Sequence, residues 1–200
     1  MLPVKRSRIT IAISTSLLRY TPMSTRMSAV AAASVLLVVA CGTATAYLLQ
    51  SVYDSAGPGE GYDKLVILDP AQFYSGSLIV EPGTSCVLHG SGAIISLGTA
   101  DSILASGPST LLDMDHCVVI GGTYGVHYGD QAQGSVVHNT FFGNKVGIAI
   151  WDGTAVTAKN NIIADAAEYG IAKVSEVTPY IAYNDVWSYG MWPYAELCWS

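Results

Sequence analysis

The chain has 200 residues, of which 50% are hydrophobic, 12% are charged and 20 are glycine. Charged residues usually make up about a quarter of a soluble domain, so this composition favours one domain of short strands and tight corners over long helices. Five of the nine basic residues lie in the first 26 positions, and the four lysines that follow stand against 15 acidic residues, a formal charge of −11. Such a surface repels phosphate backbones, which excludes nucleic acid as an expected partner.

The first 46 residues have the layout of an export signal. An apolar stretch, Ala29–Ala40, follows the basic residues and precedes small ones. Two processing sites compete: Cys41 ends a lipobox-like sequence and is a lipidation candidate, and Ala46 ends an A-x-A site for signal peptidase. An uncleaved membrane anchor over Ala29–Leu49 is the alternative. We therefore predict an extracellular, periplasmic or lipid-anchored protein that contacts the membrane only through this segment or a lipid on Cys41.

A repeat follows Gly122. Each unit opens with a glycine and an aliphatic residue, and an asparagine stands fourteen residues after the glycine. The glycines are Gly125, Gly147 and Gly170, and the asparagines are Asn139, Asn161 and Asn184. Apolar residues alternate within each unit, which is the periodicity of strands. A unit of 22 or 23 residues that holds two or three short strands is one turn of a β-solenoid.

The repeat predicts an all-β fold, a right-handed parallel β-helix of about five coils over residues 63–187. Residues 47–62 are expected to form a linker and N-terminal cap. Residues 188–200 are expected to form an irregular tail, which we interpret as truncated. A weaker upstream copy of the repeat places Leu112, Asp115 and Cys117 at the positions of Val136, Asn139 and Phe141.

The recurrent asparagine has a structural explanation. Each coil places the same residue above its counterpart, about 4.8 Å away. An amide both donates and accepts hydrogen bonds and tolerates left-handed backbone angles. We therefore predict that Asn139, Asn161 and Asn184 form a structural ladder and bind no ligand.

The runs HNTF, KNNII and YNDVW, with the upstream LDMDHCVVIGG, resemble the repeats of right-handed parallel β-helix proteins in the pectin-lyase-like superfamily of exported bacterial proteins. The resemblance implies the fold and leaves the activity open, since the superfamily includes lyases, hydrolases, epimerases and adhesins. A pectate-lyase-type enzyme would use an arginine as its base, and no arginine follows Arg26. The N-T-D, D-D, G-H-G and R-I-K motifs of polygalacturonases are also missing from the sequence. We therefore assign no catalytic residue.

A column of acids is the first candidate site. Asp130, Asp152 and Glu176 fall five or six residues after their coil glycines and would stack on successive coils. Stacked carboxylates repel one another unless they are solvated or bridged by a hard cation, so this column is a candidate Ca²⁺ site. The alternative is a set of solvated turn acids.

Two aromatic residues, Tyr128 and Trp151, lie next to these acids, and Lys173 stands in the column of Tyr128. Aromatic faces beside carboxylates are typical of sugar-binding grooves, and a lysine suits an acidic sugar. We therefore predict that Tyr128, Trp151, Asp130, Asp152 and Lys173 contact a polysaccharide. The alternative is that the aromatic rings fill the core.

Two further groups of residues carry chemistry that a site could use. Asp113, Asp115 and His116 suggest a metal or acid–base site, but strand alternation places His116 on the face opposite both acids, which argues against it. Cys86 and Cys117 stand in apolar strand-like runs, where buried free thiols are expected in preference to a disulfide.

Three functions are consistent with the sequence. The first is an exported, non-catalytic β-helix module that contacts polysaccharide. The second is a polysaccharide lyase or glycoside hydrolase acting through the acid column with Lys159 or Lys173. The third is a structural surface spacer. The missing arginine and hydrolase motifs favour the first and third.

Overall fold

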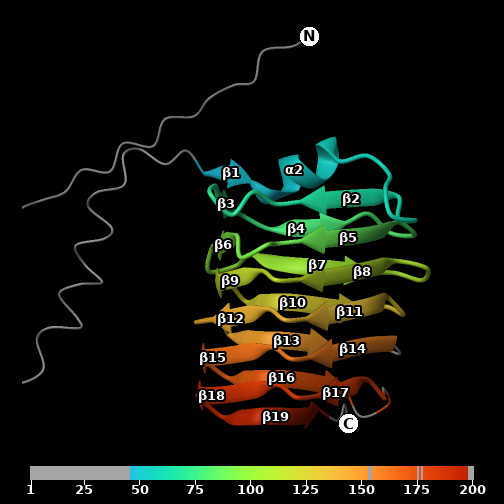
Figure 1. Ribbon diagram of the computed structural model, residues 1–200. Coiled ribbons are helices and arrows are strands. Elements are labelled where there is room, and N and C mark those ends of the chain that lie inside the picture. Colours follow the sequence, from blue (N-terminus) through green and yellow to red (C-terminus); the bar gives the residue numbers. More distant parts are fainter. Residues whose placement is uncertain (1–45, 153–154, 175, 177, 198–200) are drawn as a thin grey trace, which may run out of the picture. The chain divides into compact units, whose positions relative to one another are not determined.

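The computed structural model describes residues 46–152, 155–174, 176 and 178–197. These residues form a parallel β-solenoid with one short helix, α2 (Leu49–Ser55) (Figure 1). All of them belong to one compact unit, Thr43–Ser200. In the part of the chain that the structure describes, no helix is long and apolar enough to cross a membrane.

Three parallel sheets form the sides of the solenoid. Sheet A contains β1 (Tyr47–Leu48), β3 (Phe73–Ser75), β6 (Ile94–Leu97), β9 (Val118–Gly121), β12 (Thr140–Phe142), β15 (Ile162–Ala166) and β18 (Asp185–Tyr189). Sheet B contains β4 (Leu78–Val80), β7 (Ser102–Ser106), β10 (Tyr124–Gly129), β13 (Val146–Ile150), β16 (Tyr169–Val174) and β19 (Trp192–Leu197). Sheet C contains β2 (Lys64–Ile67), β5 (Ser85–His89), β8 (Leu111–Asp115), β11 (Gln133–Val137), β14 (Ala155–Lys159) and β17 (Tyr180–Ala182).

Each coil runs through sheet C, then sheet A, then sheet B, and the strands of successive coils pair in parallel. The described residues hold six coils, which confirms the predicted parallel β-helix and adds one coil to the expected number. The extra coil, β2 to β4, carries no ladder asparagine, so the repeat pattern did not reveal it. Alternate residues of each strand point inward and fill the interior with Val, Ile, Leu and Phe side chains.

The asparagine ladder lies at the corner between sheets C and A. The backbone N–H of Asn139 donates to Asn161 Oδ1 at 3.0 Å, and that of Asn161 donates to Asn184 Oδ1 at 3.0 Å. Each side-chain amide also donates to a carbonyl of the coil before it, as Asn161 Nδ2 does to Val136 O at 2.8 Å. Asn139 and Asn161 are almost fully buried. The ladder therefore satisfies backbone groups that the corner removes from the sheets.

The upstream copy of the repeat was aligned two residues out of register. Val136 pairs with Met114 and not with Leu112, and Cys117 occupies the ladder position, where its N–H donates to Asn139 Oδ1 at 2.9 Å. A cysteine cannot continue the amide stack, so the ladder ends there. This explains why the asparagine pattern fades upstream of Asn139.

The two ends of the solenoid differ. At the N-terminal end, α2 buries Leu49 and Tyr53 against the first coil. At the other end, the segment expected to be an irregular tail contains β19, which pairs with β16 from Trp192 to Leu197 and completes the sixth coil. The tail lacks the repeat's apolar alternation because its inward positions hold Tyr194 and Glu196, yet the backbone pairing needs no particular side chain.

Both cysteines in the described part of the chain are free and buried, which confirms the prediction for Cys86 and Cys117. Burial raises the pKa of the Cys86 thiol to about 12, and burial also raises the pKa of Cys117. Both groups are therefore uncharged thiols at neutral pH and act as small core residues. Cys41 and Cys198 lie outside the described residues.

We predict that Asn161→Ala lowers the free energy of unfolding by about 3 kcal/mol, because it leaves the Asn139 N–H and the Val136 carbonyl buried without partners. Urea denaturation followed by circular dichroism measures this loss. Gln133→Ala, on the exposed side of β11, is the matched control and should change stability by less than about 0.5 kcal/mol. Equal, small effects of both substitutions would contradict the assigned role of the ladder.

Candidate functional site

The corner between sheets B and C holds the predicted acid column. Asp130 and Asp152 follow β10 and β13 on successive coils, and both have left-handed backbone angles. Asp130 Oδ2 accepts a hydrogen bond from Ser106 Oγ at 2.6 Å. Both carboxylates and Glu176 are exposed to solvent. Among the residues that the structure describes, no three His, Cys, Asp or Glu side chains are arranged to hold a metal ion, and the Ca²⁺ site at this column stays a prediction.

Tyr128 is not a surface residue, contrary to the sequence-based prediction. Its side chain is fully buried, and its hydroxyl donates to Leu112 O at 2.7 Å. The predicted column is correct, since Tyr128 pairs with Ile150 and Ile150 with Lys173, but this column faces the core. Sequence periodicity gives two faces to each strand and does not say which one is buried when both carry apolar residues.

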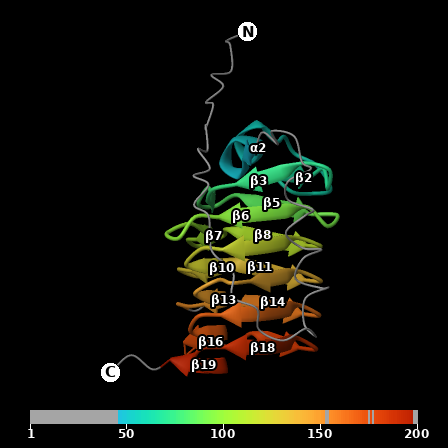
Figure 2. The same cartoon turned by 90° about the vertical axis from the view of Figure 1, so that its left-hand side faces the viewer.

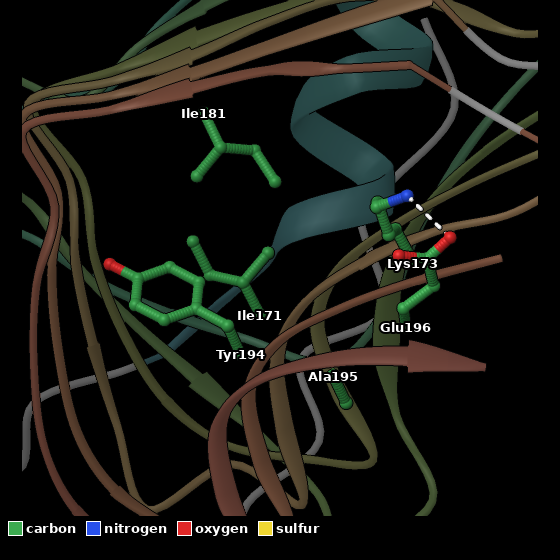
Figure 3. Close-up of a pocket in the computed structure, with 6 residues that line it drawn as sticks. All are labelled: Ile171, Lys173, Ile181, Tyr194, Ala195 and Glu196. Atoms are coloured by element: carbon green, nitrogen blue, oxygen red, sulfur yellow. Dashed lines mark ion pairs between the residues drawn. The ribbon is translucent and has the colours of Figure 1, made fainter. Parts of the chain in front are cut away.

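Lys173 lies at the C-terminal end of this inward column, far along the chain from the other predicted sugar contacts. Its ammonium forms an ion pair of 3.1 Å with Glu196 at the edge of a cavity of about 280 Å³. Ile171, Ile181 and Tyr194 form the apolar wall of this cavity, which lies where the sixth coil ends (Figure 3). Lys173 stands in the inward column beside Ile150, whereas Trp151 packs on the outer side of sheet B.

An aromatic cluster on the outer side of sheet B includes one predicted residue, Trp151. Its ring packs edge-on against His127, with centroids 4.5 Å apart, and against Tyr124 at 5.4 Å. Burial lowers the pKa of His127, although the nearby Asp152 and Asp130 oppose this effect. His127 is therefore neutral at pH 7, and its buried Nε2 has no hydrogen-bond partner among the described residues. We call Tyr124, His127 and Trp151 the aromatic cluster.

A second group of polar residues lies at the corner between sheets C and A, on the outer side of the ladder. The residue before each ladder position has a left-handed backbone, with φ of 50° at His116, 58° at His138 and 56° at Asn160. These three side chains form a column at the 22-residue spacing of the coils. The His116 and His138 rings stack with centroids 5.1 Å apart, and Asn160 Nδ2 lies 3.0 Å from His138 Nε2. We call this group the histidine column.

Asp115 connects the histidine column to the N-terminal coils. One of its oxygens lies 2.9 Å from Nδ1 of His116 and the other 2.7 Å from Nδ1 of His89. Strand alternation predicted that His116 faces away from both Asp113 and Asp115. Instead, β8 ends at Asp115 and the left-handed backbone of His116 turns its ring toward that carboxylate. Asp113 does not join them, because its carboxylate accepts hydrogen bonds from Tyr62 and Ser135.

His89 is held between two carboxylates. Its Nε2 lies 3.1 Å from Glu60, and its Nδ1 is bonded to Asp115. Partial burial disfavours the imidazolium, but the hydrogen bonds to Glu60 and Asp115 outweigh it and raise the pKa of His89. His89 therefore links Glu60, in the N-terminal segment, to Asp115 on the third coil.

The histidine column could have been predicted from one signal in the sequence. A histidine or asparagine directly precedes three of the four ladder positions from Cys117 onward, at His116, His138 and Asn160. This regularity becomes visible only when Cys117 is counted as a ladder position. The upstream copy of the repeat, aligned two residues out of register, placed Asp115 there instead.

The fold and these surface features define a parallel β-helix repeat protein. The model of one protein family matches residues 89–196, which is more than half of the chain. The chain therefore belongs to the family described as periplasmic copper-binding protein (NosD). Membership in a periplasmic family agrees with an exported β-helix module. No curated protein and no solved structure matches the chain.

We predict that the stability of the fold falls as the pH rises through the pKa of folded His89. Because this pKa is raised above its ordinary value of 6.5, the folded protein binds the proton more tightly than the unfolded chain. The stabilisation is therefore complete below about pH 6.5 and is lost above the folded pKa. Urea midpoints between pH 5.5 and 8.5 measure the fall. His89→Gln should flatten this profile, whereas His138→Asn should leave it; a profile unchanged in His89→Gln would refute the assignment.

Proposed function

We propose that this protein is an exported β-helix module that binds a copper ion at the histidine column, through Nε2 of His116 and Nε2 of His138. The observation that carries the proposal is the stack of these two imidazoles, 5.1 Å apart, with Asp115 bonded to Nδ1 of the first. The family description supplies copper as the metal, and imidazole is a suitable ligand for copper.

Asp115 prepares His116 for this role. A carboxylate that accepts a hydrogen bond from Nδ1–H leaves the Nε2 lone pair of a neutral imidazole available to a metal, and it raises the basicity of that nitrogen. The ring of His116 is 60% exposed, so Nε2 is accessible from solvent. On His138 the corresponding nitrogen faces the Asn160 amide, which a copper ion would displace.

His89 is excluded as a ligand in this scheme. Both of its ring nitrogens face carboxylates, so its imidazolium has no lone pair to offer. The site therefore has two protein ligands, with the remaining positions left to water or to a partner. Two imidazoles suit copper better than calcium or magnesium, which prefer oxygen ligands.

We predict that the protein binds one copper ion per chain and that the double variant His116→Asn/His138→Asn loses this binding. Asparagine tolerates the left-handed backbone at both positions, so the fold should survive. Calorimetry gives the stoichiometry, and the electron paramagnetic resonance of bound Cu²⁺ reports imidazole nitrogens. Asp115→Asn should weaken binding by about tenfold or more, as loss of a carboxylate behind a ligand does.

The control for copper binding is His127→Gln, which removes an imidazole from a different sheet and should leave affinity and spectrum unchanged. Retention of the same nitrogen signal and stoichiometry in the double variant would exclude the histidine column. Equal losses in the double variant and in His127→Gln would point to a general effect on the fold.

A second candidate function is glycan contact at the aromatic cluster. The observation that favours it is the neutral His127, whose buried Nε2 can accept a hydrogen bond from a sugar hydroxyl. The Trp151 ring beside it offers an apolar face, and Asp130 and Asp152 add acceptors at the adjoining corner. This candidate keeps Trp151, Asp130 and Asp152 from the sequence-based prediction and replaces Tyr128 and Lys173 with Tyr124 and His127.

We predict that a glycan-array hit of the wild-type protein is weakened about tenfold by Trp151→Ala, since an aromatic contact of this kind is worth on the order of 1 kcal/mol or more. Trp192→Ala, which removes an exposed tryptophan from the sixth coil, is the matched control and should bind as the wild type does. An array without any hit, or equal binding by both variants, would exclude the aromatic cluster and leave copper as the single proposal.

A further inference from the structure

The outer side of sheet A carries apolar side chains along the whole solenoid. Its strands place two columns of residues on the outside. One column is Phe73, Ile94, Val118, Thr140, Ile162 and Asp185, and the other is Leu48, Ser75, Ser96, Ile120, Phe142, Ala164 and Trp187. The most exposed members are Leu48 (61%), Phe73 (42%), Phe142 (44%), Ile162 (46%) and Trp187 (52%). Half-exposed Ile94, Val118 and Ile120 fill the spaces between them. This surface, which we call the apolar face, turns toward the viewer in Figure 2.

The apolar face is almost free of charge. Within the described part of the chain, the seven strands of sheet A contain two charged residues, Asp165 and Asp185, both in the last two coils. Sheet C has the opposite character, since it carries Lys64, Asp113 and Lys159 in addition to the histidine-linked Asp115. In a protein of net charge −6, a surface with so little charge and several exposed aromatic and aliphatic side chains marks a surface that binds something apolar.

The chain enters the solenoid at the edge of this same face. β1 pairs with β3 at the N-terminal end of sheet A, and the residue before β1 is Ala46. Cys41, the lipidation candidate in the sequence, precedes Tyr47 by six residues, which span at most about 20 Å when extended. A lipid on Cys41, or a retained apolar segment Ala29–Ala40, would therefore hold this end of the apolar face close to a bilayer.

We infer that the apolar face lies on a phospholipid bilayer, with the exposed Phe, Ile and Trp side chains inserted at the boundary between headgroups and acyl chains. The seven strands of sheet A, about 4.8 Å apart, make a contact about 29 Å long between β1 and β18. Sheets B and C then face away from the membrane. This inference is independent of copper and of glycan binding, and it extends the membrane contact beyond the N-terminal segment.

The test uses the exported protein with Cys41→Ser, which removes any lipid, and follows its co-sedimentation with phosphatidylcholine vesicles. In this background, Phe142→Ser/Ile162→Ser removes two side chains from the middle of the apolar face. The matched control, Ile67→Ser/Ile79→Ser, removes two side chains of similar exposure (62% and 54%) from sheets C and B. Circular dichroism melting shows that both variants are folded.

The Cys41→Ser protein should bind the vesicles. The Phe142→Ser/Ile162→Ser variant should bind them with an affinity lower by a factor of about ten or more. The Ile67→Ser/Ile79→Ser control should bind as strongly as the Cys41→Ser protein. Absence of vesicle binding, or equal binding by both double variants, would overturn the inference. If light scattering instead gives a dimer that only Phe142→Ser/Ile162→Ser dissociates, without vesicle binding, the apolar face joins two copies of the chain, which also overturns it.

Discussion

The hydrogen bonding between successive coils determines every other feature of this protein. Parallel strand pairing sets one spacing along the axis, so each residue lies against the same position of the coils before and after it. At the corners, where the strands turn, the asparagine side chains take over the bonding between coils. The same spacing stacks the imidazoles of His116 and His138, and it sets Asp130 beside Asp152. Candidate sites of this protein are therefore columns, built from one position repeated on successive coils.

The fold could be predicted from the sequence because the repeat has a strong signature at Asn139, Asn161 and Asn184. Each of these side-chain amides hydrogen-bonds to the backbone of a neighbouring coil. Asparagine therefore recurs at this corner although the residues of the strands vary. The first coil was not counted, since its corner lacks the amide. The last strand was not predicted, because residues 192–197 lack the apolar alternation of the other coils, and backbone pairing with β16 forms it all the same.

The candidate sites were predicted less well, for two local reasons. The column of Tyr128, Ile150 and Lys173 was correct in register and wrong in direction, because both faces of the strand are apolar and only packing against the other sheets shows which is inside. The contact between His116 and Asp115 was not predicted, because the strand pattern was extended one residue beyond the end of β8. The left-handed backbone of His116, which the sequence does not encode in an obvious way, brings the imidazole to Asp115.

The cap at the N-terminal end has a further consequence, for folding. Every strand pairs with a strand about 22 residues away, so no contact between coils requires distant parts of the chain to meet. A coil gains its pairing from a neighbouring coil, and α2 covers the exposed side of the first coil with Leu49 and Tyr53. The chain is thus suited to order from its N-terminus, one coil at a time, as it emerges from an export channel. An insertion of one whole coil would lengthen the solenoid, and an insertion at a corner would leave the columns in register. Cys86 pairs with Lys64, 22 residues before it, and with Leu112, 26 residues after it.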